Sequence, residues 1–535
     1  MATEPSPQRA YRAACPNCGA PVEFRSAASA FAVCSFCKST VVREGDALRR
    51  IGESAELFDD HSPLQLGASG KYQGAAFTLV GRLQYRYAEG TWNEWHALFD
   101  SGKSGWLSED NGRYVIAFDA PLEGPAPGAT SLQAGAQVQV AGQAWSVASV
   151  TEARLIAAQG ELPYAPNLAR GFVVSDLRNT RGEVGTLDYG DAVTGGVPRW
   201  SIGRSVAISE LAMSGLADVA EKTLKGRSVE CPSCGTALDV KLSTTQSIVC
   251  TQCHAVVDVS AGVGGELQHY AQANGMAPLI PLGSVGTLAL GKKALPWQVV
   301  GYAERCEVAG ADADDGQSFW REYLLYHRSE GFAFLVDAQD GWSWTTPITG
   351  VPERSGDNVK HEGALYRKLY DYTGMVTYVL GEFYWQVTKN QRTFNTDYQG
   401  SGAAAAKRLN REQTGSGETQ EVVWSGGETL AADTVLKAFR LAPDKSAALQ
   451  RDALPTAFNA SSTLAKIAIW AVIIIVVLLL FRCSGGGSSD CSDTRATFGE
   501  ASQEYQNCIN RSRSGGSYGT SGGSFGGFSS GGGHK

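Results

Sequence analysis

Eight of the twelve cysteines fall into two sets of four with the same spacing. The sets are Cys15, Cys18, Cys34 and Cys37, then Cys231, Cys234, Cys250 and Cys253, each in the pattern C-x2-C-x15-C-x2-C. Each C-x-x-C turn offers two sulfur ligands, and a hairpin between the turns brings both pairs into one tetrahedron. The spacing predicts two zinc ions, one in each set. Iron in a rubredoxin-like site is the alternative metal, and reactive or disulfide-paired thiols are the alternative without one.

A site closed by four thiolates has no coordination position left for water or a substrate, so we expect both zinc ions to be structural. His254 directly follows Cys253 and is expected to be a surface neighbour of the site, since four thiolates already complete it. Thiolate ligands must stay reduced, which favours a cytoplasmic location for the cysteine sets. Residues 1–15 lack the apolar segment of a signal peptide, in agreement with that location.

The two cysteine sets belong to an internal repeat. Cys231 follows Cys15 by 216 residues, and the same offset relates Gly67 to Gly283. Further along, FTLVGR at Phe77 corresponds to WQVVGY at Trp297, and GELPY at Gly160 to GEFYW at Gly381. Each copy is predicted to be a zinc β-ribbon followed by a larger module. The ribbons are placed at 13–45 and 229–262, and the modules at 61–210 and 279–440.

Short runs of alternating apolar and polar residues, rich in Val, Tyr, Trp and Phe, fill both modules. Turn residues separate these runs about every ten residues. The pattern predicts a mainly β protein in which two zinc β-ribbons alternate with two antiparallel β-barrel or sandwich modules. Helical periodicity is confined to residues 208–224 and 434–441, where we expect helices that close the modules.

The repeated string G/F-x-V-V-G-R, followed by W-x-E-W/Y and then G-x-x-W-L, resembles the bacterial domain-of-unknown-function family 4178. Both modules carry it, although the second has GFAFLV where the first has GWLSE. Members of this family often carry zinc ribbons. The resemblance implies a bacterial membrane-associated system, with envelope stress as one setting, and it supplies no established activity.

Residues 464–481, LAKIAIWAVIIIVVLLLF, contain one charged side chain in 18 residues. As a helix they would extend about 27 Å, close to the hydrocarbon thickness of a membrane. We therefore expect one C-terminal transmembrane helix in the bacterial inner membrane, with the ribbons and modules in the cytoplasm. The Gly/Ser-rich residues 484–535 are expected to form a disordered tail outside, where Cys491 and Cys508 would be able to form a disulfide.

The remaining chemistry-bearing residues point to structure rather than to a known reaction. Only two glutamate pairs are shared by the repeats, Glu94 with Glu322 and Glu161 with Glu382, and each lies between large apolar residues on a predicted strand. We expect them to bind an arginine or backbone donors inside the modules, so no catalytic residue is assigned. No P-loop, dinucleotide-binding or nucleophile-elbow motif is present.

The charge balance argues against a nucleic-acid partner. The chain has a net charge of −8, and the two ribbon regions carry opposite charges, +3 over residues 1–50 and −2 over 228–262. The favoured function is a membrane-anchored, non-enzymatic scaffold that binds a protein partner through duplicated modules. A membrane-tethered, hydrolase-like enzyme and a nucleic-acid-binding regulator that uses its ribbons are the alternatives.

Overall fold

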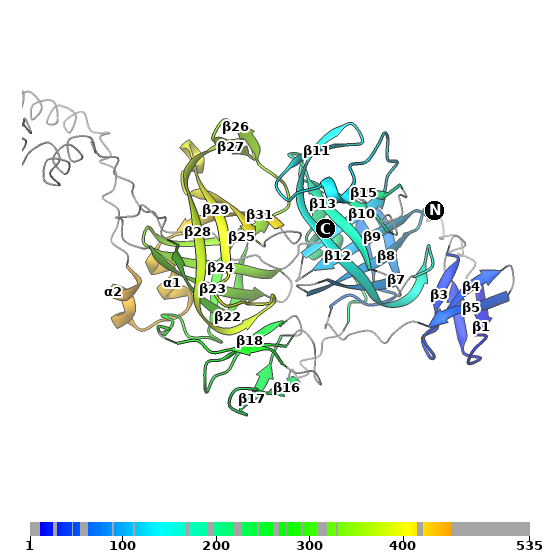
Figure 1. The fold of residues 1–535 in the computed structure, drawn as a ribbon, viewed down its shortest axis with the longest axis horizontal. Coiled ribbons are helices and arrows are strands. Elements are labelled where there is room, and N and C mark those ends of the chain that lie inside the picture. Colours follow the sequence, from blue (N-terminus) through cyan, green and yellow to red (C-terminus); the bar gives the residue numbers. More distant parts are fainter. Residues whose placement is uncertain are drawn as a thin grey trace, which may run out of the picture. The chain divides into compact units, whose positions relative to one another are not determined.

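The structure is a computed structural model, and it describes residues 11–450 with internal gaps. The gaps are 25–28, 45–46, 54–61, 88–89, 111–112, 167–170, 191–196, 218–226, 243–244, 260–266, 274, 292, 309–317, 328–329 and 415–420. Strands dominate the described residues, as the sequence predicts (Figure 1).

Each cysteine set lies in a small ribbon of short antiparallel strands. Ribbon 1 consists of β1 (Tyr11–Ala14), β2 (Pro21–Phe24), β3 (Phe31–Val33), β4 (Ser39–Glu44) and β5 (Ala47–Glu53). Ribbon 2 consists of β16 (Arg227–Glu230), β17 (Ala237–Val240), β18 (Ser247–Val249), β19 (Val256–Asp258) and β20 (His269–Tyr270). In both, β-hairpins carry the cysteine turns at one end.

The first module is a closed barrel of eight antiparallel strands, here called barrel 1. Going round it, the strands are β7 (Ala75–Tyr87), β8 (Gly90–Phe99), β9 (Ser104–Asp110), β10 (Arg113–Asp119), β15 (Arg199–Val206), β14 (Glu183–Asp188), β13 (Gly171–Arg178) and β12 (Gln143–Leu162), which pairs with β7 again. Two short strands extend this sheet, β6 (Ser69–Tyr72) beside β7 and β11 (Gln137–Val140) beside β12.

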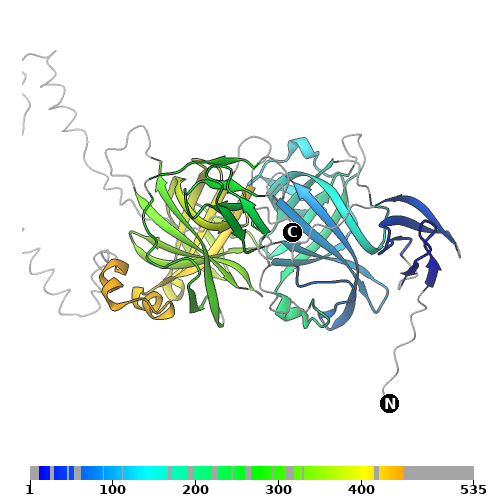
Figure 2. The same ribbon diagram turned by 90° about the horizontal axis from the view of Figure 1, so that it is seen from below.

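The second module, barrel 2, is also a closed barrel (Figures 1 and 2), and its strand pairing repeats the topology of barrel 1. Its eight strands are β22 (Ala294–Glu307), β23 (Phe319–His327), β24 (Gly331–Ala338), β25 (Gly341–Ile348), β31 (Glu421–Leu430), β30 (Lys407–Thr414), β29 (Arg392–Gly400) and β28 (Ala364–Phe383), which closes on β22. The added short strands are β21 (Val285–Ala289), β26 (Glu353–Ser355) and β27 (Asn358–His361). The sequence predicts a barrel or a sandwich for each module, and both modules are barrels.

Both barrels close at a pair of facing glycines. Gly81 faces Gly160 in barrel 1, and Gly301 faces Gly381 in barrel 2. Gly160 and Gly381 have φ angles of 72° and 90°, a region that favours glycine. A Cβ atom on either would collide with a carbonyl oxygen of the facing strand. The glycines allow the sharp strand bend that closing an eight-stranded barrel requires.

Side chains alternate between the interior and the outside of barrel 2. One apolar cluster fills part of the interior and includes Leu324, Phe334 and Val379. The outer face of β22 to β25 carries a second cluster, which is covered by Val435 of helix α1 (Ala432–Ala438) and by Phe439, the residue after the helix. The short helix α2 (Ser446–Leu449) follows, and Trp342 Nε1 donates to the Leu449 carbonyl oxygen at 2.8 Å.

The helical predictions are half correct. Helix α1 lies where periodicity predicts it, but the helix expected over 208–224 is wrong for its described part, where Ile208–Leu211 form a single 3-10 turn. Leu211 is buried in the outer cluster of barrel 1, so its apolar spacing reflects packing of an irregular segment. Within the described residues, further 3-10 turns lie at Ala129–Ser131, Gly402–Ala404 and Pro443–Lys445.

No helix in the described part of the chain is long and apolar enough to cross a membrane. The predicted span at 464–481, the tail at 484–535 and the hypothesised disulfide between Cys491 and Cys508 all lie outside the described residues.

Candidate metal centres

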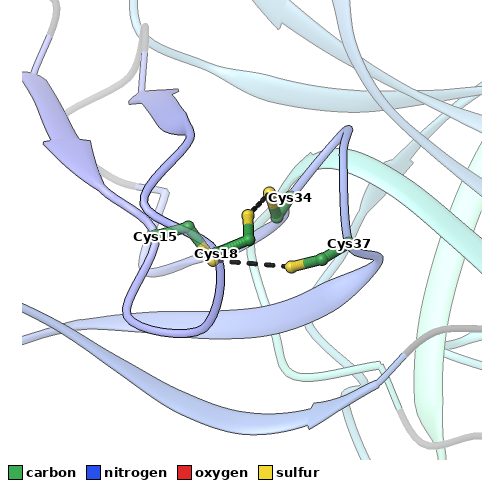
Figure 3. Close-up of side chains that lie close together, drawn as sticks. All are labelled: Cys15, Cys18, Cys34 and Cys37. Atoms are coloured by element: carbon green, nitrogen blue, oxygen red, sulfur yellow. Dashed lines mark hydrogen bonds between the residues drawn. The ribbon is translucent and has the colours of Figure 1, made fainter.

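The four cysteines of each set come together, as the spacing predicts. Figure 3 shows the first set. Within each set all four sulfur atoms lie within 4.8 Å of one another. Cys15 Sγ is 3.6 Å from Cys37 Sγ, and Cys18 Sγ is 3.7 Å from Cys34 Sγ. The second set repeats this geometry, with 3.7 Å between Cys231 and Cys253 and 3.6 Å between Cys234 and Cys250.

These distances fit a tetrahedral metal ion. Four sulfurs bound about 2.3 Å from zinc lie about 3.8 Å from one another, whereas disulfide sulfurs lie about 2.05 Å apart. None of these eight cysteines forms a disulfide. Both clusters are thus geometrically able to hold zinc, and four thiolates would leave the ion no open position.

Tight turns place the sulfurs. In ribbon 1, Gly19 N donates to Cys15 O at 2.9 Å, and Lys38 N donates to Cys34 O at 3.0 Å. The residue after each C-x-x-C has a positive φ, 76° at Gly19 and 57° at Lys38, and ribbon 2 repeats this with 74° at Gly235 and 57° at His254. The left-handed residue turns the chain back into the next strand, so that both sulfurs of a turn point to the same side.

Polar neighbours favour thiolates at one position of each set. The Ser39 hydroxyl, 3.2 Å from Cys37 Sγ, is the main cause that lowers the pKa of Cys37 to about 5. Thr236 acts in the same way on Cys234 and lowers its pKa to about 6. In contrast, burial raises the pKa of Cys231 to about 12. A bound divalent cation would supply the positive charge that four adjacent thiolates need.

His254 is not part of the second cluster. Its Nδ1 atom lies 3.2 Å from the hydroxyl oxygen of Tyr378, on the outer face of barrel 2. The residue after the last cysteine of ribbon 2 therefore contacts the barrel.

Each ribbon is joined to its barrel by main-chain pairing. In the first copy, Phe31–Val33 pair antiparallel with residues 160–162 at the end of β12. In the second copy, Ser247 and Ile248 pair with Phe383 and Glu382 at the end of β28. Val33 packs into an apolar cluster of barrel 1, and Val249 into the interior cluster of barrel 2. The strand that ends one residue before the third cysteine of each site thus pairs with the sheet of the barrel.

Residues 65–207 and 282–432 match the family described as Domain of unknown function (DUF4178), and the two matches together cover more than half of the chain. The chain belongs to this family. The two matches correspond to barrels 1 and 2, so the predicted tandem repeat of the DUF4178 domain is confirmed. Comparison with curated proteins and with solved structures gives no match.

The glutamates shared by the two DUF4178 copies lie in structural positions in barrel 2. Glu382 accepts hydrogen bonds from Lys241 N (3.0 Å), Leu242 N (2.9 Å) and the Thr245 hydroxyl (2.7 Å), all from ribbon 2. Its carboxylate therefore fixes the β17–β18 connection of ribbon 2 onto the barrel. Glu161 is the counterpart of Glu382 in barrel 1. It is 4% exposed, and its main chain pairs with that of Ala32 in ribbon 1.

Glu322 points into barrel 2, where Arg305 Nη1 donates to its Oε1 atom at 3.2 Å. The adjoining interior cavity has a volume of about 10 Å³, room for about one water molecule. Glu94 takes the same place in barrel 1. It lies opposite Leu83 on the neighbouring strand, and Glu322 lies opposite Ala303 in the same way. Beside Glu322 the space is too small for a substrate. The Arg305 partner agrees with the structural interpretation of this residue made from the sequence.

Proposed function

We propose that the protein is a membrane-anchored binding scaffold in which zinc stabilises each ribbon and a ribbon strand pairs with the DUF4178 barrel. One observation carries this proposal. Both copies have a closed four-cysteine cluster on a ribbon, and a strand of that ribbon pairs with the barrel sheet. A closed thiolate site contributes folding energy and no reaction. Each copy is therefore best suited to present a rigid surface.

Duplication supports a binding role for these surfaces. Two linked modules that engage one partner gain from effective concentration, and avidity exceeds the single-site affinity by about 10²–10⁴-fold when the geometry allows both to bind. We propose a protein partner with two equivalent binding sites. The opposite charges of the two ribbon regions disfavour a shared nucleic-acid ligand.

The apolar residues 464–481 would tether the scaffold to a bacterial inner membrane. The reduced thiols required by the metal sites favour the cytoplasmic side for both ribbons and both barrels. The scaffold would then gather its partner at the inner surface of the membrane.

The test is purification of the full chain from detergent-solubilised membranes with any partner present at fixed stoichiometry. Partner recovery is compared among the unaltered chain, the single variants C15S and C231S, the double variant and the control C306S. Cys306 is a buried thiol of β22 outside both clusters, so its substitution spares the metal sites. We expect weaker recovery in each single variant, loss in the double variant and no change in C306S. Absence of a stoichiometric partner, or recovery that survives the double substitution, would contradict the proposal.

A further inference from the structure

A serine and a histidine of barrel 1 form a hydrogen-bonded pair that has no counterpart in barrel 2. His96 Nε2 lies 2.9 Å from the hydroxyl oxygen of Ser104, and His96 Nδ1 lies 3.0 Å from the main-chain oxygen of Glu161. His96 is on β8, Ser104 begins β9, and Glu161 is near the end of β12. Three strands thus fix one arrangement of hydroxyl, imidazole and carbonyl.

The carbonyl oxygen determines which imidazole nitrogen carries the proton. A main-chain oxygen only accepts, so Nδ1 of His96 must donate to it. In the neutral ring Nε2 then has a free lone pair, and the Ser104 hydroxyl donates to it. Burial lowers the pKa of His96, which keeps the ring neutral at pH 7, while the hydrogen bond to the Glu161 oxygen and the charge of Asp119 oppose this shift in part. This is the order of contacts by which a positioned base activates a serine.

The pair lies where its two members have different access to solvent. His96 is 1% exposed, whereas Ser104 is half-buried beside the exposed turn of Gly102 and Lys103. Trp106, on the strand of Ser104, has its ring 5.3 Å from the His96 ring and 5.6 Å from that of Tyr164. Trp106 is itself only 6% exposed, so it covers the His96 ring from solvent and leaves Ser104 as the accessible member of the pair.

Barrel 2 shows that the fold does not need this pair. Leu324 pairs with Gly301 as His96 pairs with Gly81, so leucine takes the histidine position. Phenylalanine takes the serine position in the same way, because Phe332 pairs with Tyr326 as Ser104 pairs with Leu98. Two apolar side chains fill the equivalent space in a barrel of the same topology. A buried imidazole with both nitrogens paired to defined groups is thus an added feature of barrel 1.

We propose that Ser104 is a nucleophile, with His96 as its general base, for hydrolysis of carboxylic esters. Ser104 Oγ forms a bond to the ester carbonyl carbon, and its proton passes to His96 Nε2. The C–O bond to the alcohol then breaks, and the alcohol leaves with that proton. Water then bonds to the acyl carbon and gives a proton to Nε2. The bond from that carbon to Ser104 Oγ breaks, and Nε2 returns the proton to Oγ, which releases the carboxylic acid and restores the hydroxyl and the neutral imidazole. This activity goes beyond the binding function and is independent of the metal sites.

The test is covalent labelling of the full chain with an alkyl fluorophosphonate, followed by peptide mapping. In this reaction Ser104 Oγ bonds to phosphorus, fluoride leaves, and the proton passes to His96. The variants are S104A, H96N and H96L, and the control is S101A. The amide introduced in H96N keeps a donor for the Glu161 oxygen but cannot act as the base, H96L copies barrel 2, and Ser101 is an exposed neighbouring serine. Zinc content and thermal unfolding identify the folded variants.

We expect the label on Ser104, unchanged in S101A, absent in S104A, and about 100-fold slower in H96N, the loss typical of removing a general base. Hydrolysis of p-nitrophenyl butyrate should fall by a similar factor. The proposal is overturned if Ser104 of the unaltered chain stays unlabelled while a known serine hydrolase in the same tube reacts. It is also overturned if folded H96N is labelled at the original rate.

Discussion

Arg305 and Glu322 form an ion pair inside barrel 2, with 3.2 Å between Nη1 and Oε1 and only 1% of each side chain exposed. Glu412, equally buried, lies 3.4 Å from the same Nη1 atom, and Trp320 Nε1 donates to Glu322 Oε1 at 2.8 Å. Burial acts to lower the pKa of Arg305, but the two carboxylates outweigh it and raise the pKa. The arginine is therefore the cation that allows two carboxylates to stay in the barrel interior.

Replacing Arg305 by methionine should destabilise barrel 2 by about 3–5 kcal/mol, because two buried carboxylates would lose their counter-ion. Chemical denaturation followed by tryptophan fluorescence measures the change. The matched control is K368A in the same barrel, which removes an exposed pair with Asp371 and should cost less than about 1 kcal/mol. Equal effects of the two substitutions would contradict the role given to Arg305.

Replacing Glu382 by glutamine should loosen ribbon 2 from barrel 2, since an amide has one acceptor oxygen where the carboxylate has two. We expect a loss of about 1–3 kcal/mol. Hydrogen exchange should accelerate at the amides of Lys241 and Leu242, which donate to this carboxylate. The control is E362Q, whose side chain is 70% exposed and should leave exchange unchanged. Unaltered protection of both amides in E382Q would show that the contact does not hold the ribbon.

Replacing Gly381 by alanine should prevent proper closure of barrel 2. The substitution forces a Cβ into a backbone with φ of 90° and against the carbonyl oxygen of Val300. G363A is the control for backbone strain alone, because Gly363 has a φ of 76° and open space around it. The control should cost about 1 kcal/mol, and G381A several times more. Similar unfolding midpoints for the two variants would mean that the close approach of the strands is unimportant.

His96 should make barrel 1 sensitive to mild acid. Burial lowers the pKa of His96 in the folded chain below its unfolded value near 6.5, so the unfolded chain binds the proton more readily. Stability should fall as the pH drops from about 6.5 toward the folded pKa, and should not change through this group above that range. Unfolding measured between pH 8 and pH 5 should show a smaller decline for H96L than for the unaltered chain. Parallel pH profiles would contradict the assignment of a neutral, buried imidazole.

The cysteine clusters and the repeat were predictable because their signals are local or periodic. A C-x-x-C turn fixes two sulfurs by its own backbone, and the constant offset between Cys15 and Cys231 exposes the duplication. Alternating apolar residues likewise indicate strands wherever one face of a sheet is buried. The prediction of mainly β modules is therefore correct. The family resemblance was also visible in the sequence.

Barrel closure and the contacts between distant residues were not predictable. Gly81 and Gly160 meet only because β7 pairs with β12, and nothing local in either segment specifies that partner. The comparison of repeats also directed attention to shared residues, and it passed over His96 because barrel 2 has Leu324 there. The proximity of Ser104 could have been suspected from the short β8–β9 turn alone, but the oxygen of Glu161 lies 65 residues from His96.

Zinc content of the purified full chain tests the central claim most directly. Two closed four-thiolate clusters predict about two zinc ions per chain by elemental analysis, about one in C234S, and two in C306S, whose thiol lies outside the clusters. Near-zero zinc in protein prepared under reducing conditions without chelators, or an unchanged value in C234S, would contradict the account.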